Sequence, residues 1–506
     1  MPIPPPRQSC DVLIRGGLVA DGTGKRTERA DVAIRDDRIV AVGDLAGWRG
    51  EDVVEAGGCV VAPGFIDVHT HDDRALLDAP VMESKTSQGV TTVIVGNCGL
   101  SLAPLLPEAC RPLPAPFDLL GTRAAYSFET VRAYVERLQD PPASVNVGVL
   151  VGHGNLRASV LDRCDRPATA SEVERMVPLA REAFEAGALG ISSGLAYDAS
   201  RHAETGEVIA LARTAAAYGG LYVTHLRDEA DGVLDAVEEA LEIGRRSGSA
   251  VVISHHKCLF RRNWGRTRET LSAIDAARAS QAVALDVYPY LASSTVLSID
   301  RIAAAEKVLV AWSEASPDAA GRDLDDLARD WDCDRVGAAR RLMPGGAVYF
   351  NMDEADLRRV LAHPRCMIGS DGVPSHPHPH PRLWGTFPRV LGRYVRQEGV
   401  LTLEEAVRKM TGLPASVFGL RDRGVLRPGA FADVTIFDPA TVADTATFDE
   451  PTRPGLGIRR VLVNGTTVFA DGQAVHRPAG RVLRRSVPAA SGAGLRSGLS
   501  RASHVA

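Results

Sequence analysis

The sequence of 506 residues lacks any run of about 18 or more apolar residues, so no membrane-spanning helix is expected. Basic residues are not in excess: the 58 Lys and Arg and 63 Asp and Glu give a net charge of −5, and no nucleic-acid partner is expected. Only eight cysteines are present, and their spacing is not that of a disulfide framework. The start, MPIPPPRQSC, has no apolar stretch typical of a secretory signal, so we expect a cytoplasmic location.

What is present is an ordinary globular composition, with 45% apolar and 24% charged residues. Both ends carry short runs of alternating apolar residues bounded by turn residues, such as DVAIRDDRIVAVG, and the second end includes an Asn-Gly hairpin turn. We predict one small β-sandwich built from residues 10–62 and 416–485; two separate β caps are the alternative. The tail, 486–506, is rich in Ser, Ala, Gly and Arg and is expected to be disordered.

Between these ends, in residues 63–415, apolar strand candidates alternate with amphipathic helical patterns. The strand candidates are 65–71, 91–97, 146–152, 189–194, 221–226, 250–256, 282–288 and 366–371. Eight such units predict the α/β class and a (β/α)8 TIM-type barrel, with the functional site at the carboxyl ends of the strands. The connection before the eighth strand is too long for one helix, so 289–350 is predicted to be an inserted lid or subdomain.

Side chains that bind metals stand at the predicted strand ends. His69 and His71 flank Thr70 at the end of the first strand, where residues i and i+2 face the same way. Cys98 follows the second strand, and His225 and His255 end the fifth and sixth. Any one of them could be a buried core residue, but together they predict a metal site.

Asp371 ends the eighth strand, where a carboxylate can bind a metal or transfer a proton; the alternative is an Asp that caps the next element. After it, His376, His378 and His380 alternate with prolines. This loop is interpreted as an adventitious nickel or zinc patch, or alternatively as a lid contact to substrate.

Many ordered motifs now indicate a family. They include PGFIDVHTHDD, GVTTVIVGNCGLS, GHGNLR, THLRDE, SHHK, DVYPY, HPRLWGTFPRVL and RPGAFADVTIFDP. The chain resembles the D-aminoacylases, which are N-acyl-D-amino-acid deacylases of the amidohydrolase superfamily, over nearly all of residues 10 to 480. The resemblance implies a (β/α)8 barrel with a small β-sandwich from both termini and an insertion near the mouth.

The resemblance also implies roles for the metal-binding residues. Cys98, His225 and His255 would hold one tightly bound zinc, and His69 and His71, with Asp371, would form a second, weaker position. Asp371 would be the catalytic acid/base. The predicted fourth strand, LGISSG, lacks the lysine that bridges two metals in many amidohydrolases, which favours one strong zinc.

Substrate contacts are implied for Tyr197, Tyr288 and Ser294, which match family positions that face the amino-acid moiety. A carboxylate substrate also needs a cation, and the position after Asp300-Arg301 that matches the family is Lys307. The expected partner is a small-molecule N-acyl-D-amino acid, and the chain is expected to be a monomer or a homodimer.

The predicted activity is zinc-dependent hydrolysis of N-acyl-D-amino acids to a carboxylate and a free D-amino acid. The D stereochemistry and the acyl amino-acid substrate follow from the resemblance, whereas the residues alone indicate a barrel metallohydrolase. The alternatives are a cyclic-amide hydrolase of the hydantoinase or dihydroorotase kind and a barrel scaffold without metal. No Gly-x-Ser-x-Gly motif indicates a serine hydrolase.

Overall fold

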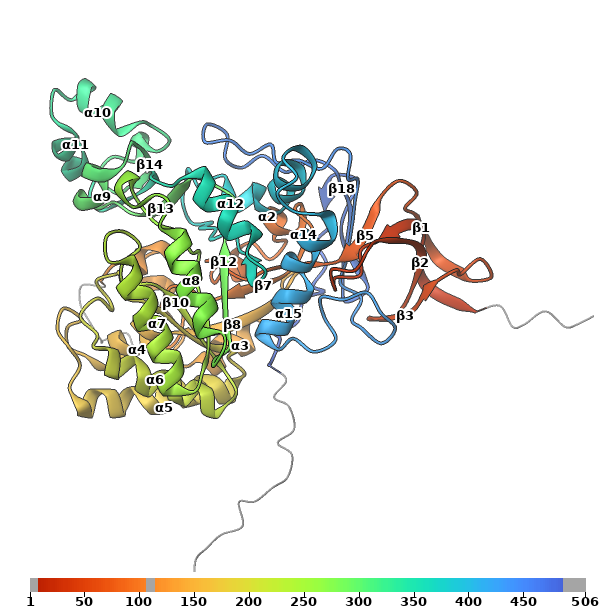
Figure 1. Ribbon diagram of the computed structural model, residues 1–506, viewed down its shortest axis with the longest axis horizontal. Coiled ribbons are helices and arrows are strands. Elements are labelled where there is room, and N and C mark those ends of the chain that lie inside the picture. The colour runs from red at the N-terminus through yellow and green to blue at the C-terminus, as the bar shows by residue number, and fades with distance from the viewer. Residues whose placement is uncertain (1–7, 106–113, 486–506) are drawn as a thin grey trace, which may run out of the picture.

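The computed structural model describes residues 8–105 and 114–485 (Figure 1). The tail predicted to be disordered, 486–506, lies outside the described residues. Within them, none of the helices has the length and apolar character that a bilayer crossing requires.

The centre of the molecule is a parallel barrel. Its strands, in chain order, are β6 (Phe65–Asp67), β7 (Val90–Val95), β8 (Asn146–Gly152), β9 (Gly190–Gly194), β10 (Leu221–His225), β11 (Ala250–Ile253), β12 (Val283–Val287) and β16 (Cys366–Ile368). Neighbours in this order pair in parallel, and a bridge between Thr70 and Gly372 brings the last strand back to the first. All eight strand candidates of the sequence therefore form barrel strands.

The barrel strands are buried on both faces, because helices cover the outside. In β7, VTTVIV, every residue is buried. The helices that surround the barrel are α3 (Val131–Arg137), α4 (His153–Val160), α5 (Ala170–Ala186), α6 (Thr205–Ala217), α7 (Val233–Ser247), α8 (Thr267–Ala277), α12 (Glu354–Ala362) and α14 (Leu403–Met410). Neighbouring helices contact each other along this series from α4 through α8 to α12, and α14 contacts β16 and β6.

Strands from both ends of the chain form one nine-stranded sheet. They are β1 (Ser9–Val19), β2 (Glu28–Arg35), β3 (Arg38–Gly43), β4 (Arg49–Glu55), β5 (Val60–Pro63), β17 (Val434–Phe437), β18 (Ile458–Val463), β19 (Thr466–Ala470) and β20 (Gln473–Ala474). The two ends meet where β17 pairs antiparallel with β5. Apolar side chains of β1, β2, β5 and β17 share one buried cluster, so the two ends form a single folding unit.

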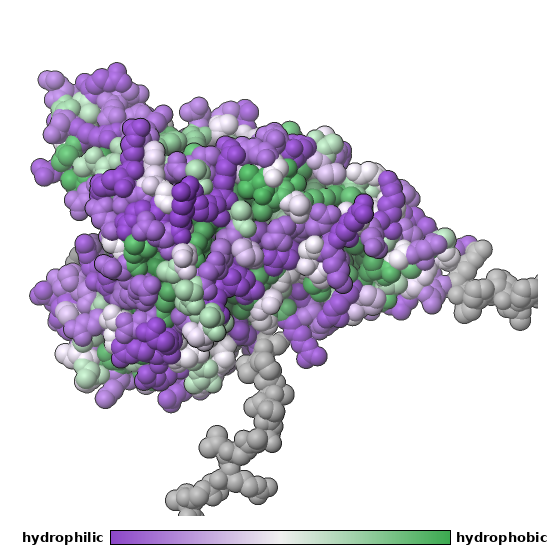
Figure 2. Space-filling model, viewed as in Figure 1, coloured by the Kyte–Doolittle hydropathy of each residue, from purple (hydrophilic) through white to green (hydrophobic). Residues whose placement is uncertain are grey.

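A smaller α/β unit is inserted between β12 and α12. It contains β13 (Ala292–Val296), α9 (Ile299–Ala304), β14 (Lys307–Ser313), α10 (Leu324–Asp330), α11 (Arg335–Leu342) and β15 (Gly345–Phe350). Its three strands form a sheet with β15 in the middle, over an apolar core of its own. In Figures 1 and 2 it forms a lobe at the upper left, set off from the barrel by an indentation of the outline. The predicted fold class, including this insertion between strands seven and eight, is confirmed.

The remaining elements are short helices that connect these units. They are α1 (Ala75–Asp78), α2 (Glu83–Thr86), η1 (Phe117–Leu120), η2 (Arg123–Ala125), η3 (Arg261–Asn263), η4 (Pro317–Ala319), α13 (Arg382–Arg389), η5 (Val390–Gln397) and α15 (Gly412–Phe418).

Candidate metal centre

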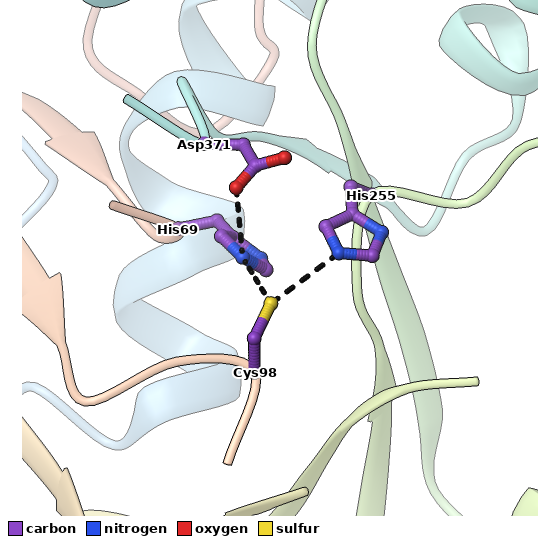
Figure 3. Close-up of side chains that lie close together, drawn as sticks. All are labelled: His69, Cys98, His255 and Asp371. Carbon is purple, nitrogen blue, oxygen red and sulfur yellow. Dashed lines mark hydrogen bonds and ion pairs between the residues drawn. The ribbon is translucent and has the colours of Figure 1, made fainter. Parts of the chain in front are cut away.

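Four buried donor side chains converge at the carboxyl end of the barrel (Figure 3). The Sγ of Cys98 lies 3.2 Å from Nε2 of His69 and 3.4 Å from Nε2 of His255. The Oδ1 of Asp371 lies 3.6 Å from Nε2 of His69. All of the donor atoms lie within 4.8 Å of one another, which is a spacing that a single ion can bridge.

A second group of donors shares His255 with the first. It contains His225, Glu229 and His255, and the rings of the two histidines lie 4.5 Å apart. The Oε2 of Glu229 lies 3.4 Å from Nε2 of His225. His225 is buried, and neither of its ring nitrogens has a hydrogen-bond partner among the described residues. Buried imidazole nitrogens without a hydrogen-bond partner are able to bind a metal ion.

His69 and His71 lie just beyond β6, on either side of the bridge residue Thr70. Both reach the same oxygen of Asp371, since Nε2 of His71 lies 3.3 Å from Oδ1. The structure thus brings the two imidazoles to one place, as the His-x-His spacing predicts.

The backbone at three donors adopts an unusual conformation. Cys98, His255 and Asp371 have φ angles of 55°, 34° and 48°, in the left-handed region that residues other than glycine avoid. Glycine makes the turn at Cys98 possible, because a Cβ on Gly194 would lie 2.1 Å from the carbonyl oxygen of Cys98. Strained backbone of this kind clusters at functional sites, where the surrounding structure holds it in place.

Charges in the centre favour the ionised forms of Cys98 and Asp371. Burial alone would raise the pKa of the Cys98 thiol, but His69 and His255 outweigh it, and the pKa lies well below its usual value. Burial would likewise raise the pKa of Asp371, but Arg382 and then His71 hold it well below the usual carboxyl range. A thiolate and a carboxylate are the forms that bind a cation.

Two of the predicted substrate residues are tyrosines beside the histidines. The ring of Tyr197 lies 4.8 Å from that of His225, and its hydroxyl is 3.1 Å from Oγ1 of Thr295. The ring of Tyr288 lies 6.5 Å from that of His255. Both tyrosines are buried at the barrel mouth.

The structure places Arg382, rather than Lys307, beside the donor groups. Lys307 begins β14, is 51% exposed and pairs with Asp323 at 3.6 Å, so the structure does not bring it to the donor groups. Arg382 is buried, lies 2.9 Å from Oδ2 of Asp371 and stacks over Tyr288 at 4.4 Å. Its Nε and Nη1 have no partner among the described residues.

The third predicted contact, Ser294, is buried with its hydroxyl unpartnered, and its carbonyl oxygen accepts from Arg382.

Three further buried residues hold His255 in place. Glu229 lies 3.1 Å from its Nδ1, Lys257 lies 2.8 Å from the same atom, and Asp286 accepts from its backbone N–H. Sequence reasoning missed Glu229 and Lys257 as site residues, although they stand inside the motifs THLRDE and SHHK. Their position two or four residues after a strand-end histidine was the available signal.

The His-Pro loop does not form the predicted metal patch. The Nε2 of His378 donates to the carbonyl oxygen of Phe448, and that of His380 donates to the carbonyl oxygen of Ala292 in β13. His376 is buried without a hydrogen-bond partner among the described residues. Because the imidazoles bond to different segments, the loop fastens the insertion and the 448 region to the barrel.

A model of the amidohydrolase family matches residues 52–469, and the chain belongs to this family. D-aminoacylase of Alcaligenes xylosoxydans xylosoxydans is 49% identical over 479 residues, which span 95% of this chain and 98% of that relative. The crystal structure of N-acyl-D-glutamate deacylase from Bordetella bronchiseptica, complexed with zinc and a phosphonate inhibitor, matches with a TM-score of 0.91 and 50% identity. That match covers 94% of this chain and 100% of the other. The predicted resemblance is confirmed.

A more distant likeness concerns the alternative activity. The structure of L-hydantoinase from Arthrobacter aurescens matches with a TM-score of 0.59 and 18% identity, over 94% of this chain and all of the other. At this level of identity the two proteins share the fold alone, so nothing here favours cyclic-amide hydrolysis.

Proposed function

We propose that this chain hydrolyses the amide bond of N-acyl-D-amino acids, giving a carboxylate and a free D-amino acid. The observation that carries the proposal is the buried group of Cys98, His69, His255 and Asp371, whose donor atoms lie within 4.8 Å of one another. Two relatives at 49% and 50% identity are a D-aminoacylase and an N-acyl-D-glutamate deacylase. The D stereochemistry of the substrate rests on these relatives.

The donor set fits zinc. Thiolate and imidazole are the ligands that zinc prefers, and the unpartnered nitrogens of buried His225 leave that side chain free to bind a metal. Cys98, His225 and His255 would hold the tight ion, and His69, His71 and Asp371 a weaker one. When bound, zinc supplies a Lewis acid that polarises the amide carbonyl and makes water more acidic.

Asp371 moves the proton between water and the leaving nitrogen. Its Oδ1 faces His71 at 3.3 Å, and its Oδ2 faces Arg382 at 2.9 Å. The Arg382 charge keeps the pKa of the carboxyl low, so Asp371 is ionised at neutral pH and can accept a proton. The carboxylic acid that results then donates this proton to the departing amine, which a general acid must do for an amide to break.

Arg382 and Ser294 orient the substrate carboxylate. The Nε and Nη1 of Arg382 are buried without partners among the described residues, so their N–H groups are available to a carboxylate, and the guanidinium keeps its charge. Stacking over Tyr288 fixes the plane of the guanidinium. The unpartnered hydroxyl of Ser294, next to Arg382, is a further donor.

The cell compartment and the assembly state are also proposed. Six cysteines of the described residues are free thiols, which supports a reducing location such as the cytoplasm; they are Cys10, Cys59, Cys98, Cys258, Cys333 and Cys366. A monomer or a homodimer remains the prediction for the assembly state, to be checked by sedimentation.

The test is stereochemical. Zinc-loaded protein is incubated in parallel with N-acetyl-D-methionine and its L enantiomer, and free amine is quantified. We expect amine from the D form alone, with the L form at least about a hundredfold slower, because one inverted centre moves a charged group out of its buried site. Equal rates for both enantiomers, or release from neither with zinc bound, would contradict the proposal.

A further inference from the structure

A cavity of about 870 Å³ lies beside the metal centre, between the barrel mouth and the insertion. Its barrel side is made by Arg74, by the segment 121–123 and by the loop 375–377. Its other side is made by residues of the insertion, among them Trp312 and Pro344. Its volume is that of a site for a sizeable ligand, and of the residues singled out in the sequence only His376 of the His-Pro loop lines it.

Two loops connect this cavity to the donor group. The loop after β6 carries the donor His71 and, three residues later, the cavity residue Arg74. The loop after β16 carries Asp371 and, five residues later, His376 in the cavity wall. The cavity therefore adjoins the metal centre on the side of His71 and Asp371.

The two oxygens of Asp371 give the bound substrate a direction. Oδ2 faces Arg382, where the proposed function places the substrate carboxylate, and Oδ1 faces His71. Asp371 protonates the amide nitrogen, so this nitrogen must lie next to the Asp371 carboxyl. The amino-acid part of the substrate extends from the nitrogen on one side and the acyl part on the other. With the carboxylate at Arg382, an acyl chain on the His71 side of Asp371 would point toward the cavity.

Part of the cavity lining is suited to an apolar group. Trp312, Pro317, Pro344 and Pro377 contribute apolar surface. The ring of buried His376 lies 6.3 Å from the Trp312 ring, and its nitrogens have no hydrogen-bond partner within residues 8–105 and 114–485. Polar groups also line the cavity: Glu314 is exposed, as are the three prolines, and the Oδ1 of Asp118 is buried without a partner among the described residues.

We propose that this cavity binds the acyl group of the substrate, and that the enzyme prefers N-acyl-D-amino acids with long apolar acyl chains over N-acetyl compounds. The inference rests on the proposed function and extends it to the acyl side of the amide. An acetyl group is too small to fill a cavity of this volume, whereas a hexanoyl or decanoyl chain would extend along its lining. Each methylene buried there raises kcat/KM by up to about fourfold.

The experiment measures kcat/KM of the zinc-loaded enzyme along two series of substrates. The first series is N-acetyl-, N-hexanoyl- and N-decanoyl-D-methionine, and the second keeps the acetyl group and changes the side chain to D-alanine and D-glutamate. We expect the hexanoyl-to-acetyl ratio to be at least about ten. Hydrolysis of the acetyl compound with a ratio near one would overturn this inference and leave the proposed function standing.

Two variants place the preference in the cavity. Trp312→Ala removes its largest apolar surface, and Thr122→Trp fills it from the exposed edge, where the Thr122 side chain makes no cap hydrogen bond. Each should lower the hexanoyl-to-acetyl ratio at least about fivefold, which is the loss of one to two buried methylenes. Trp331→Ala, on the same insertion but outside the cavity lining, is the matched control and should keep the ratio.

The same variants separate the acyl group from the other possible occupant, the amino-acid side chain. If Trp312→Ala and Thr122→Trp change the ranking in the side-chain series and not in the acyl series, the cavity holds the side chain and the inference is wrong. Absence of amine from every D substrate would overturn the proposed function and this inference with it.

Discussion

The ammonium group of Lys85 is fully buried beneath the donor side chains and bonds to oxygens of two loops. Its partners, at 2.8 to 3.2 Å, are Asp67, Thr70, Asp72 and Ser370. Thr70 adjoins His69, and Ser370 adjoins Asp371, so Lys85 fixes the distance between the first and last strand ends. This matters because a single bridge, rather than a full strand pairing, closes the barrel there.

Lys85→Met should lower the free energy of unfolding by about 3–5 kcal/mol, because the carboxylates of Asp67 and Asp72 stay buried without their cation. Zinc retention should fall as well, since the two loops lose their common partner. Guanidinium unfolding and zinc content per chain are the measurements.

The matched control is Lys409→Met, which also removes a fully buried lysine. Lys409 bonds to carbonyl oxygens of His363 and Cys366, where β16 begins, at the opposite end of that strand from Asp371. The Lys409→Met variant should have a lower free energy of unfolding than the wild type and should retain zinc. Wild-type zinc retention in Lys85→Met would contradict the positioning role.

At the scale of elements, the barrel strands could be predicted because each is an apolar run with turn residues at its ends, as in β7 and β8. The convergence of the donor side chains could be predicted because parallel strands place their carboxyl ends at one edge of the barrel. Both signals are local in the sequence, and this is why the sequence is sufficient to predict the barrel and the types of donor residue at its strand ends.

The rest depends on tertiary contacts that no local pattern encodes. The left-handed backbone at Cys98, His255 and Asp371 exists because neighbouring loops hold it. Arg382, the first residue of α13, lies beside Asp371 and Ser294 through tertiary contacts, which the sequence spacing that pointed to Lys307 does not reveal. The closely spaced histidines of the His-Pro loop suggested a metal site in the sequence. In the structure, His378 and His380 instead donate to carbonyl groups of distant segments.

At the scale of the whole molecule, buried neutral histidines couple folding to pH. Burial lowers the pKa of His256 to about 4 and that of His376 to about 3. Below pH of about 6.5 the unfolded chain takes up protons at these positions and the folded chain does not. The stability that they contribute is therefore present above that pH and is lost as pH falls toward 4. Asp73, whose pKa burial raises to about 7, acts in the opposite direction.

A variant isolates one histidine from these opposing effects. His256→Gln should gain stability relative to the wild type as pH falls from 6.5 to 4.5, by up to about 2 kcal/mol. Urea unfolding of both metal-free proteins at several pH values measures the difference. A difference that stays constant over this range would show that His256 does not titrate between the two states.

One metal centre, built around Cys98, is proposed to carry the hydrolysis. The most direct measurement is zinc per chain together with kcat/KM for N-acetyl-D-methionine in Cys98→Ala. Cys258→Ala, which removes a thiol that is equally buried but outside the donor groups, is the control. We predict that Cys98→Ala loses the tight zinc and at least about a thousandfold in kcat/KM, while the control keeps both. Full zinc and full rate in Cys98→Ala would contradict the account.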